Sequence, residues 1–358
     1  MATVTPISGC GSKGPACFLV ESGAVRVLLD LGYGPQPGLW PDVSKVGRVD
    51  ALLISHSHRD HAGALELLGA VGDPPVYASD IVRRLLPAGL ESHSLPLEGV
   101  RDVCGLRVTS GRNGHAPGGI WLHLDIGGGL LYMGDCSVES ALYAYDAPPE
   151  ADTAILDASY GDYAASLTQA LPAFDAMVDA GPELFPAPPA GRAPEIALYV
   201  KRSGRGVPRI DEAVRTAMLR LVHEDSACLR DGVAEDIAAI AKLAPAIGNP
   251  EGIMIAAAAD GTSGAAAEAI GRWEGSTTPQ IVFTGYLPPG TPAERLTRSG
   301  RARYMRWNVH PRLSDNAGLV SDIRARTVLP AFGDARHLPA WQKAFAPARV
   351  ALKGPVTL

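Results

Sequence analysis

The sequence predicts an α/β protein in which sheets are covered by helices. Short apolar runs, typical of buried strands, alternate along the chain with segments whose apolar residues recur at helical spacing. Glycines separate many of these segments and mark the turns between them. Packing helices on the faces of sheets is the economical way to bury such an alternation, so we expect this architecture.

The elements expected before residue 160 are mostly strands. They fall at 17–21, 25–30, 52–54, 76–78, 106–109, 120–124, 130–133 and 153–156, with helices at 64–70 and 81–86. Beyond residue 160 we expect helices at 165–179, 211–224 and 234–243, and strands at 252–255, 280–283 and 327–329. The second alternation predicts a further α/β unit with its own core.

Three histidines and one aspartate lie within six residues, directly after the apolar run at 49–54. His56, His58, Asp60 and His61 therefore fall on a loop at the carboxyl end of a buried strand. Such a strand can hold ligands of different length around one point, as a transition metal requires. A solvated polar loop is the alternative interpretation, but four ligand-type side chains at this spacing favour a metal site.

Other expected strands also end in residues that can bind a metal. His115 follows one strand and Asp135 follows another, each beside glycines that let the backbone turn tightly near a centre. Asp30 ends the strand at 25–30, and we expect its carboxylate to brace the histidine loop rather than to ligate. Together with the loop, His115 and Asp135 supply ligands that a loop of six residues could not supply alone.

This series of residues resembles the metallo-β-lactamase superfamily. Three later segments, at 157–161, 185–196 and 284–291, are similar to signatures of its β-CASP branch, the nucleases of RNA 3′-end processing and of ribonuclease J type. These segments stand in the order of the family and extend over most of the chain. Their combination is much more specific than any one motif.

The resemblance implies a fold and a domain organisation. The fold would be an αββα metallo-β-lactamase sandwich with an inserted α/β β-CASP cap domain. Residues 1–160 and 310–358 would form the discontinuous metallo-β-lactamase domain, and residues 161–309 the cap. The proline-rich stretch at 182–194 would then be an ordered connection from a strand to a helix.

The resemblance also assigns the ligands of two metal sites, for one or two zinc ions or, alternatively, manganese. The histidine of the family's second site matches Phe332, which cannot ligate, so that site would lack one protein ligand. His310 and His337 lie near the altered positions and could substitute, although a structural role is the commoner one for each. The first site would comprise His56, His58, His115 and Asp135, and the second Asp60, His61 and the bridging Asp135.

Catalytic and substrate-binding roles follow from the same resemblance. Asp60 would orient or deprotonate the attacking water, and Asp157 would orient a ligand histidine or act on the leaving-group side. Asn316 matches a family histidine that contacts the scissile phosphate and protonates the leaving group, but an amide cannot deliver a proton. Ser159, Arg192 and Asn316 are expected to contact the substrate.

These residues predict a metal-dependent hydrolase. The simplest hypothesis is a phosphodiesterase, either an exonuclease or an endonuclease, that attacks RNA or single-stranded DNA with a hydroxide generated from water by the metal. The missing proton donor and the acidic composition also fit a metallohydrolase of a small ester, thioester or lactam. A third hypothesis is a non-catalytic nucleic-acid-processing subunit, but the complete histidine loop favours an enzyme.

Composition limits the partners and the compartment. The net charge of −6 argues against tight nonspecific binding of nucleic acid over the whole surface. Basic runs at 201–209 and 295–306 could form a local groove or simply a solvated edge. Five scattered cysteines without a Cys-x-x-Cys pair indicate a reducing cytoplasm, and no apolar run approaches the roughly 18 residues of a membrane span, so no membrane partner is expected.

Overall fold

The computed structural model describes residues 2–358, which divide into two compact units. The first unit contains the chain up to residue 138, residues 145–164 and residues 310–358. The second contains residues 139–144 and 165–309. The first junction therefore lies at 164/165 rather than at 160/161, and the short segment 139–144 is an additional part of the second unit. Each unit has its own core.

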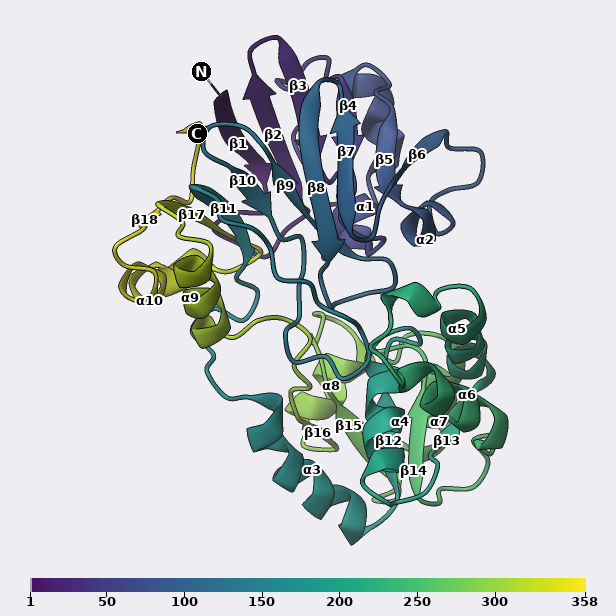
Figure 1. The fold of residues 1–358 in the computed structure, drawn as a ribbon. Coiled ribbons are helices and arrows are strands. Elements are labelled where there is room, and N and C mark those ends of the chain that lie inside the picture. The colour runs from purple at the N-terminus through teal and green to yellow at the C-terminus, as the bar shows by residue number, and fades with distance from the viewer. Residues whose placement is uncertain (1) are drawn as a thin grey trace. The chain divides into compact units, whose positions relative to one another are not determined.

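Two mixed sheets form the centre of the first unit (Figure 1). The strand order is β19-β1-β2-β3-β4-β5-β6 in one sheet and β18-β17-β11-β10-β9-β8-β7 in the other. The strands of the first sheet are β1 Ala2–Ser8, β2 Cys17–Ser22, β3 Val25–Leu29, β4 Ala51–Leu53, β5 Val76–Ser79, β6 Ser92–Leu95 and β19 Val356–Thr357. Those of the second sheet are β7 Gly99–Val103, β8 Leu106–Arg112, β9 Ile120–Leu124, β10 Leu130–Tyr132, β11 Thr153–Asp157, β17 Thr327–Ala331 and β18 Arg349–Val350.

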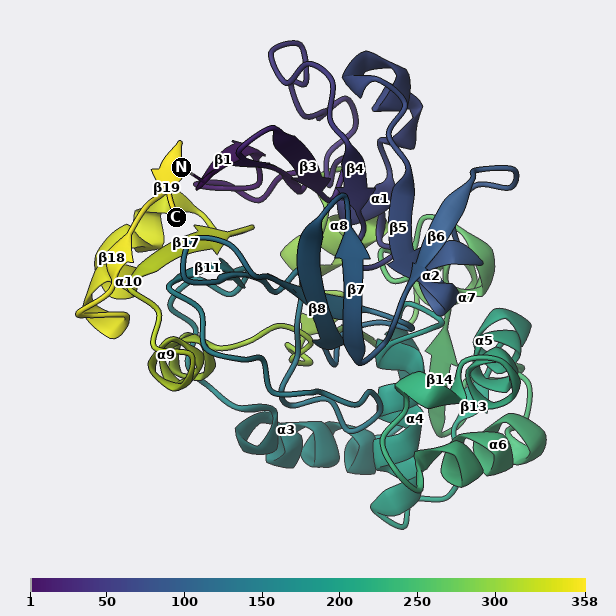
Figure 2. The same cartoon turned by 45° about the horizontal axis from the view of Figure 1, so that its top comes forward.

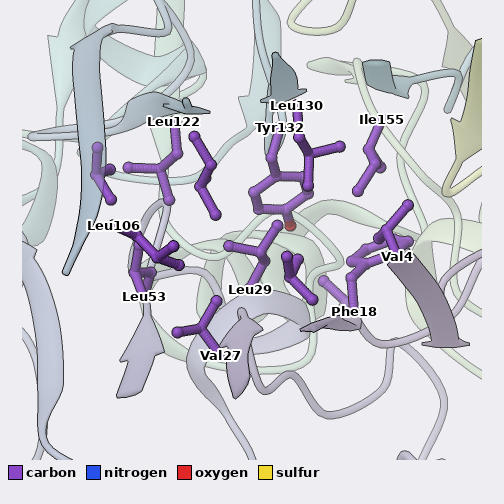
Figure 3. Close-up of a cluster of buried hydrophobic side chains, with 14 of the residues drawn as sticks. Val4, Phe18, Val27, Leu29, Leu53, Leu106, Leu122, Leu130, Tyr132 and Ile155 are labelled. Atoms are coloured by element: carbon purple, nitrogen blue, oxygen red, sulfur yellow. The ribbon is translucent and has the colours of Figure 1, made fainter. Parts of the chain in front are cut away.

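The two sheets pack face to face through alternate residues of their strands. Val27 and Leu29 of β3 point into the space between the sheets, whereas Leu28 points to the outer face. Figure 3 shows the inner layer, in which Leu29 lies among side chains of the opposite sheet such as Tyr132. Each fully buried aliphatic side chain stabilises the fold by about 1.5–3 kcal/mol. This period of two is the pattern from which the strands were expected.

Helices cover the outer faces of both sheets and complete the αββα sandwich. On the first sheet lie α1 (Arg59–Ala62), α2 (Asp80–Arg83) and the 3₁₀ helix η1 (Leu65–Val71). On the second lie α9 (Leu313–Asp322) and α10 (Leu338–Ala344), whose Trp341 is fully buried. Helices α9 and α10 and the strand β18 lie side by side in Figures 1 and 2. The sequence therefore predicted the fold class correctly.

One expected helix differs in type. The segment at 64–70 was expected to form a helix of ordinary pitch, but residues 65–71 form the tighter 3₁₀ helix η1. Gly69 lies inside this segment, and Gly72 ends it with a φ of 90°. Two glycines within four residues lower the α-helical propensity of so short a segment, and short helical pieces are where 3₁₀ geometry is common.

The second unit is an α/β domain built on a parallel sheet. Its strand order is β13-β14-β12-β15-β16. The strands are β12 Glu183–Pro186, β13 Arg209–Ile210, β14 Ile253–Ala256, β15 Gln280–Phe283 and β16 Ala302–Tyr304. The helices are α3 Leu167–Ala180, α4 Arg192–Arg202, α5 Glu212–His223, α6 Val233–Leu243, α7 Gly264–Trp273 and α8 Pro292–Arg298, with short 3₁₀ turns η2 Ser226–Cys228 here and η3 Ala335–His337 in the first unit.

Helices pack on both faces of this parallel sheet. Helices α7 and α8 contribute Ile270 and Leu296 to a core with Leu184 of β12. The next residue of that strand, Phe185, faces the other way and stacks on Phe174 of α3, with ring centroids 5.2 Å apart. On the same unit α5 and α6 lie side by side in both views (Figures 1 and 2). None of the helices within residues 2–358 is both long and apolar enough to cross a membrane.

A buried carboxylate begins the central strand of the parallel sheet. Glu183 is 3% exposed, and its Oε2 atom makes no hydrogen bond. Burial raises the pKa of this carboxyl to about 7, although the positive charge of Arg303 acts in the opposite direction. Because the folded pKa lies above that of the unfolded chain, folding favours the protonated form. The stabilisation is complete below about pH 4.3 and is lost as the pH rises through about 7.

We predict that Glu183→Gln makes the second unit less sensitive to pH between 5 and 8. An uncharged amide avoids the cost of ionising a buried group, so the variant should gain on the order of 2 kcal/mol at pH 8 relative to its difference from the wild type at pH 5. Denaturant unfolding at a series of pH values measures this gain. The matched variant Glu268→Gln changes an exposed carboxylate on α7 and should keep the wild-type profile. Parallel profiles for wild type and Glu183→Gln would contradict the assignment.

Candidate metal centre

The histidine loop connects the end of β4 to the short helix α1. His56 and His58 lie on the loop, and Asp60 and His61 lie within α1. The side chains of this segment meet His115, on the loop after β8, and Asp135, three residues beyond Tyr132 at the end of β10. Within each of two groups, one ligand atom per residue lies within 4.8 Å of the others: His56, His58, His115 and Asp135 in one, and Asp60, His61 and Asp135 in the other.

Asp135 is the carboxylate on which the imidazoles converge. Its Oδ2 atom lies 3.9 Å from Nε2 of His56 and 3.6 Å from Nε2 of His115. Its Oδ1 atom lies 3.3 Å from Nε2 of His61. The backbone reaches this position through Gly134, at a φ of 57°, where a Cβ atom would lie 2.6 Å from Oγ of Ser55. Only glycine fits there.

The buried polar atoms of the centre fit a divalent metal ion. Nε2 of His56, Nε2 of His61 and Oδ1 of Asp135 are all buried and make no hydrogen bond. An unpaired buried polar atom costs about 1–3 kcal/mol, so three that face one another need an explanation. Imidazole nitrogens and a carboxylate oxygen in this arrangement are ligands of zinc and related ions. Burial, with the charges of His61 and His58, keeps the pKa of His56 well below its usual range, which maintains the neutral form that ligates.

Asp30 braces this centre from behind. It follows β3 and is fully buried. Its carboxylate accepts hydrogen bonds from the backbone N–H and the hydroxyl of Ser55, both at 2.6 Å, and from the hydroxyl of Tyr132. Nδ1 of His61 lies 2.7 Å from the same carboxylate, which orients Nε2 toward Asp135. These contacts confirm the bracing role expected from the sequence.

Phe332 occupies the side of the centre next to His61. Its ring is nearly fully buried and packs against the His61 ring, with centroids 4.9 Å apart. The residue follows β17 at a φ of 62°, and its N–H donates to the carbonyl of Gly9 at 2.6 Å. An aromatic ring supplies no ligand, so the group of Asp60, His61 and Asp135 receives nothing from this segment.

A third group of ligand-type residues comprises Asp135, Asp157 and His310. Nδ1 of His310 lies 2.8 Å from Oδ2 of Asp157 and 3.8 Å from Oδ2 of Asp135. The His310 ring also packs against His115 and Tyr160, at centroid distances of 4.8 and 5.2 Å. Burial alone would lower the pKa of His310, but the carboxylates of Asp157 and Asp135 outweigh it and raise the pKa.

Asn316 is buried, whereas Ser159 is partly exposed. Asn316 lies inside α9, is 3% exposed, and donates from Nδ2 to the backbone carbonyl of Asp157 at 2.7 Å. Its Nδ2 atom holds the end of β11, whereas its buried Oδ1 atom makes no hydrogen bond. Ser159 is partly exposed, and its N–H donates to Oδ1 of Asp157 at 3.0 Å. Asp157 is therefore held from both sides.

Arg192 and the basic runs belong to the second unit. Arg192 begins α4, and its guanidinium lies on Gly285, where a Cβ atom would be 1.5 Å from Nη1. The basic side chains at 201–209 and 295–298 pair with nearby carboxylates, and exposed pairs of this kind contribute little to stability. The charge at 201–209 and 295–298 is thus balanced, which favours a solvated edge over a basic groove for these residues, whereas the rest of the second run, 299–306, stays a candidate for the groove. The pairs are Lys201 and Arg202 with Asp236, Arg205 with Asp175 and Asp179, Arg209 with Glu251, Arg295 with Glu274 and Arg298 with Glu294.

His310 was predicted only as a possible substitute ligand. Its Nδ1 atom lies 3.8 Å from Oδ2 of Asp135, and it stands six residues before the Asn316 that matches the family histidine in sequence. A usable signal was present, because His310 is the first residue of the returning segment of the first unit. Other histidines were less ambiguous. His337 packs over Gly161, where a Cβ atom would meet its ring at 2.5 Å, and its Nδ1 lies 3.2 Å from Asp162.

Comparisons with known proteins identify relatives of this chain. Residues 12–187 match the Metallo-beta-lactamase superfamily. The chain is 27% identical over 251 residues to the transcription termination factor FttA of Methanosarcina mazei, a match that covers 56% of this chain and 39% of FttA. It is 46% identical over 57 residues to the RNase J-like protein of Methanocaldococcus jannaschii, which covers 16% of this chain and 13% of that protein. The chain thus spans well under half the length of these relatives.

A solved structure shares the fold over the whole chain. A protein of unknown function from Enterococcus faecalis V583 matches with a TM-score of 0.61 at 13% identity, covering 100% of both chains. At this identity the likeness concerns the fold alone. It agrees with the αββα sandwich and the additional α/β unit described above.

We predict one firmly held metal ion per chain. The first group has four ligands, whereas the second has three, of which Asp135 is shared, because Phe332 contributes none. Elemental analysis after dialysis measures the metal content, with zinc and manganese determined together. Phe332→His should increase the content toward two ions, and Phe332→Leu, which restores no ligand, serves as the matched control. Two ions held equally well by the wild type would contradict the prediction.

We predict that Asp30→Asn weakens the binding of the metal about 10- to 100-fold. The amide no longer fixes the tautomer of His61 or balances the hydroxyl donors that face it. Titration with zinc against a competing chelator measures the change. Tyr132→Phe removes one donor to the same carboxylate and should weaken binding much less. An unchanged affinity in a folded Asp30→Asn protein would show that Asp30 has no part in the centre.

Proposed function

Because the chain belongs to the metallo-β-lactamase superfamily and to its β-CASP branch, we propose that it is a metal-dependent phosphodiesterase that hydrolyses RNA or single-stranded DNA. One relative is named a transcription termination factor and another an RNase J-like protein. These names support a nucleic acid as the substrate. The arrangement of the chain's own residues supports the reaction.

The first part of the proposal concerns the metal. His56, His58, His115 and Asp135 would hold a zinc or manganese ion. When bound, such an ion lowers the pKa of water and polarises a phosphoryl oxygen. Asp30 keeps the neighbouring His61 in the orientation that directs Nε2 to the centre. Asp60, which is partly exposed at the start of α1, would orient the attacking water or accept its proton.

The pair of His310 and Asp157 is the observation that carries the proposed reaction. Asp157 is fully buried, and its carboxylate is held by the N–H groups of Cys136 and Ser159 at 3.1 and 3.0 Å. It contacts Nδ1 of His310 at 2.8 Å, so Nε2 is the ring nitrogen that would face the substrate. A histidine oriented in this way can deliver a proton to a leaving oxygen. We therefore assign to His310 the proton-donor role that the amide of Asn316 cannot fill.

The proposed location is the cytoplasm. All five cysteines are free in the part of the chain that the structure describes. Cysteines that remain unpaired are usual in a reducing compartment, where disulfides rarely persist. The oxidation state of the purified protein, determined by thiol titration, tests this part of the proposal.

We predict that the wild type cleaves labelled RNA or single-stranded DNA in the presence of Zn²⁺ or Mn²⁺. Cleavage should disappear in His58→Ala and Asp60→Ala, because each removes a side chain of the centre. His310→Ala should lower kcat about 10²- to 10⁴-fold and keep the wild-type metal content, since His310 acts on the proton and not on the ion. His223→Ala, a change of an exposed histidine on α5, is the control.

Two substrates with different leaving groups distinguish a proton-donating histidine from a structural one. A nitrophenyl phosphodiester releases an anion that is stable without a proton, so His310→Ala should lose much less rate on this substrate than on RNA. An equal loss on both substrates would assign His310 a structural role. Turnover of small esters or lactams without any cleavage of RNA or DNA would contradict the proposed function as a whole.

A further inference from the structure

An exposed tryptophan lies on the loop between β3 and β4. Trp40 is 39% exposed. The other tryptophans of the chain, Trp121, Trp273, Trp307 and Trp341, are at most 7% exposed. A large aromatic side chain that keeps so much of its surface in water loses much of the stabilisation that burial would provide. Singly exposed aromatic side chains are common on protein surfaces, so the surroundings of Trp40 decide what its exposed face can bind.

Trp40 is part of a stack that includes a cation. Its ring packs on the ring of Tyr33, with centroids 4.2 Å apart and an interplanar angle of 58°. The guanidinium of Arg59 also lies on the Tyr33 ring, with Cζ 4.1 Å from the centroid. Tyr33 itself is buried, and its hydroxyl accepts a hydrogen bond from the N–H of Gly38 at 2.7 Å. Trp40 and Arg59 are the exposed members of the stack.

A hydrogen bond and close backbone packing attach the stack to the loop of the metal centre. Arg59 stands in the sequence between the ligand-type residues His58 and Asp60. The N–H of Tyr33 donates to the carbonyl of Arg59 at 2.8 Å. The adjoining Gly32 comes so close that a Cβ atom would lie 1.8 Å from the carbonyl oxygen of Asp60. The loop that presents Trp40 therefore has a fixed position relative to the residues of the centre.

We propose that Trp40, Tyr33 and Arg59 form a platform for a nucleobase of the substrate. A base would stack on the exposed face of Trp40, and the guanidinium of Arg59 would pair with a neighbouring phosphate. Aromatic faces combined with a cation are how single-stranded nucleic acids are bound without sequence preference. This inference rests on the proposed function, because it assigns the platform to the same strand that the metal centre would cleave.

The position of the stack favours a nucleic acid over a protein partner. Protein interfaces use the same residue types, but this stack is attached to residues 59 and 60 of the loop at which the strand would be cleaved. Stacking of one base on one aromatic ring changes affinity by between about fivefold and about 150-fold. The platform should thus contribute to binding of the strand and to the choice of single-stranded over paired substrates, whose bases are already stacked.

Binding of an uncleavable strand tests the platform. The probes are a phosphorothioate-linked oligonucleotide and an abasic strand of the same length and charge. The wild type should bind the strand with bases at least about fivefold more tightly than the abasic strand. Only the strand with bases should quench the tryptophan fluorescence, because Trp40 is the exposed tryptophan. Equal binding of both strands would overturn the proposal and would leave a protein partner as the occupant.

Variants of Trp40 separate stacking from folding. Trp40→Ala should bind the two strands equally, whereas Trp40→Phe should keep most of the preference and lose the quenching. Tyr304→Ala, a change of a 42% exposed aromatic on β16, controls for the loss of any surface ring and should keep the preference. A wild-type preference in folded Trp40→Ala would overturn the platform. If cleavage assays find no nuclease activity while the preference and the quenching remain, the proposed function fails and the platform stands.

Discussion

The buried carboxylate of Asp30 is the contact on which the metal centre depends. It lies at the end of a strand of the first sheet, at a φ of 57°, and accepts hydrogen bonds from Ser55, His61 and Tyr132. Tyr132 belongs to the second sheet, so one carboxylate connects both layers of the sandwich with the histidine loop. An unpaired carboxylate in this position would be strongly destabilising, but its several donors offset the cost of burying it. The geometry of the centre is thus fixed by the same contact that joins the sheets.

The strands that the sequence did not predict are mostly those at the sheet edges. The central strands bury side chains on both faces, as Leu28 and Leu29 of β3 do, and so produce the apolar runs from which strands were recognised. The edge strands β6, β7, β13, β16, β18 and β19 are short and carry polar residues, because one side of each borders on solvent. β1 and the central strand β12 were missed for another reason. Pro6 and three hydroxyl residues mask the pattern of β1, and Pro182, Pro186 and the buried Glu183 mask that of β12. These strands are placed by pairing with a neighbour, which local patterns do not encode.

From the sequence, only those residues of the candidate site that follow expected strands could be predicted to lie together. His56, His115 and Asp135 each come shortly after an apolar run, so their meeting at one edge could be anticipated. His310 follows a segment of the other unit instead, and only the folded chain brings it to Asp157. Sequence similarity to the family motif selected Asn316 instead. This residue lies within α9, and its amide donates to a backbone carbonyl. The substrate contact expected of Asn316 remains a prediction, because its hydrogen bond to a backbone carbonyl does not test it.

The returning segment of the first unit gives the two sides of the centre different chemistry. Phe332 places an apolar ring against His61, whereas His310 places an imidazole against Asp157. In hydrolases with two ions, the second ion helps to stabilise the leaving oxygen. A centre with fewer ligands for a second ion would depend more strongly on proton delivery to that oxygen. The loss of a ligand at Phe332 and the presence of an oriented histidine at His310 are therefore compatible features of one hydrolytic centre.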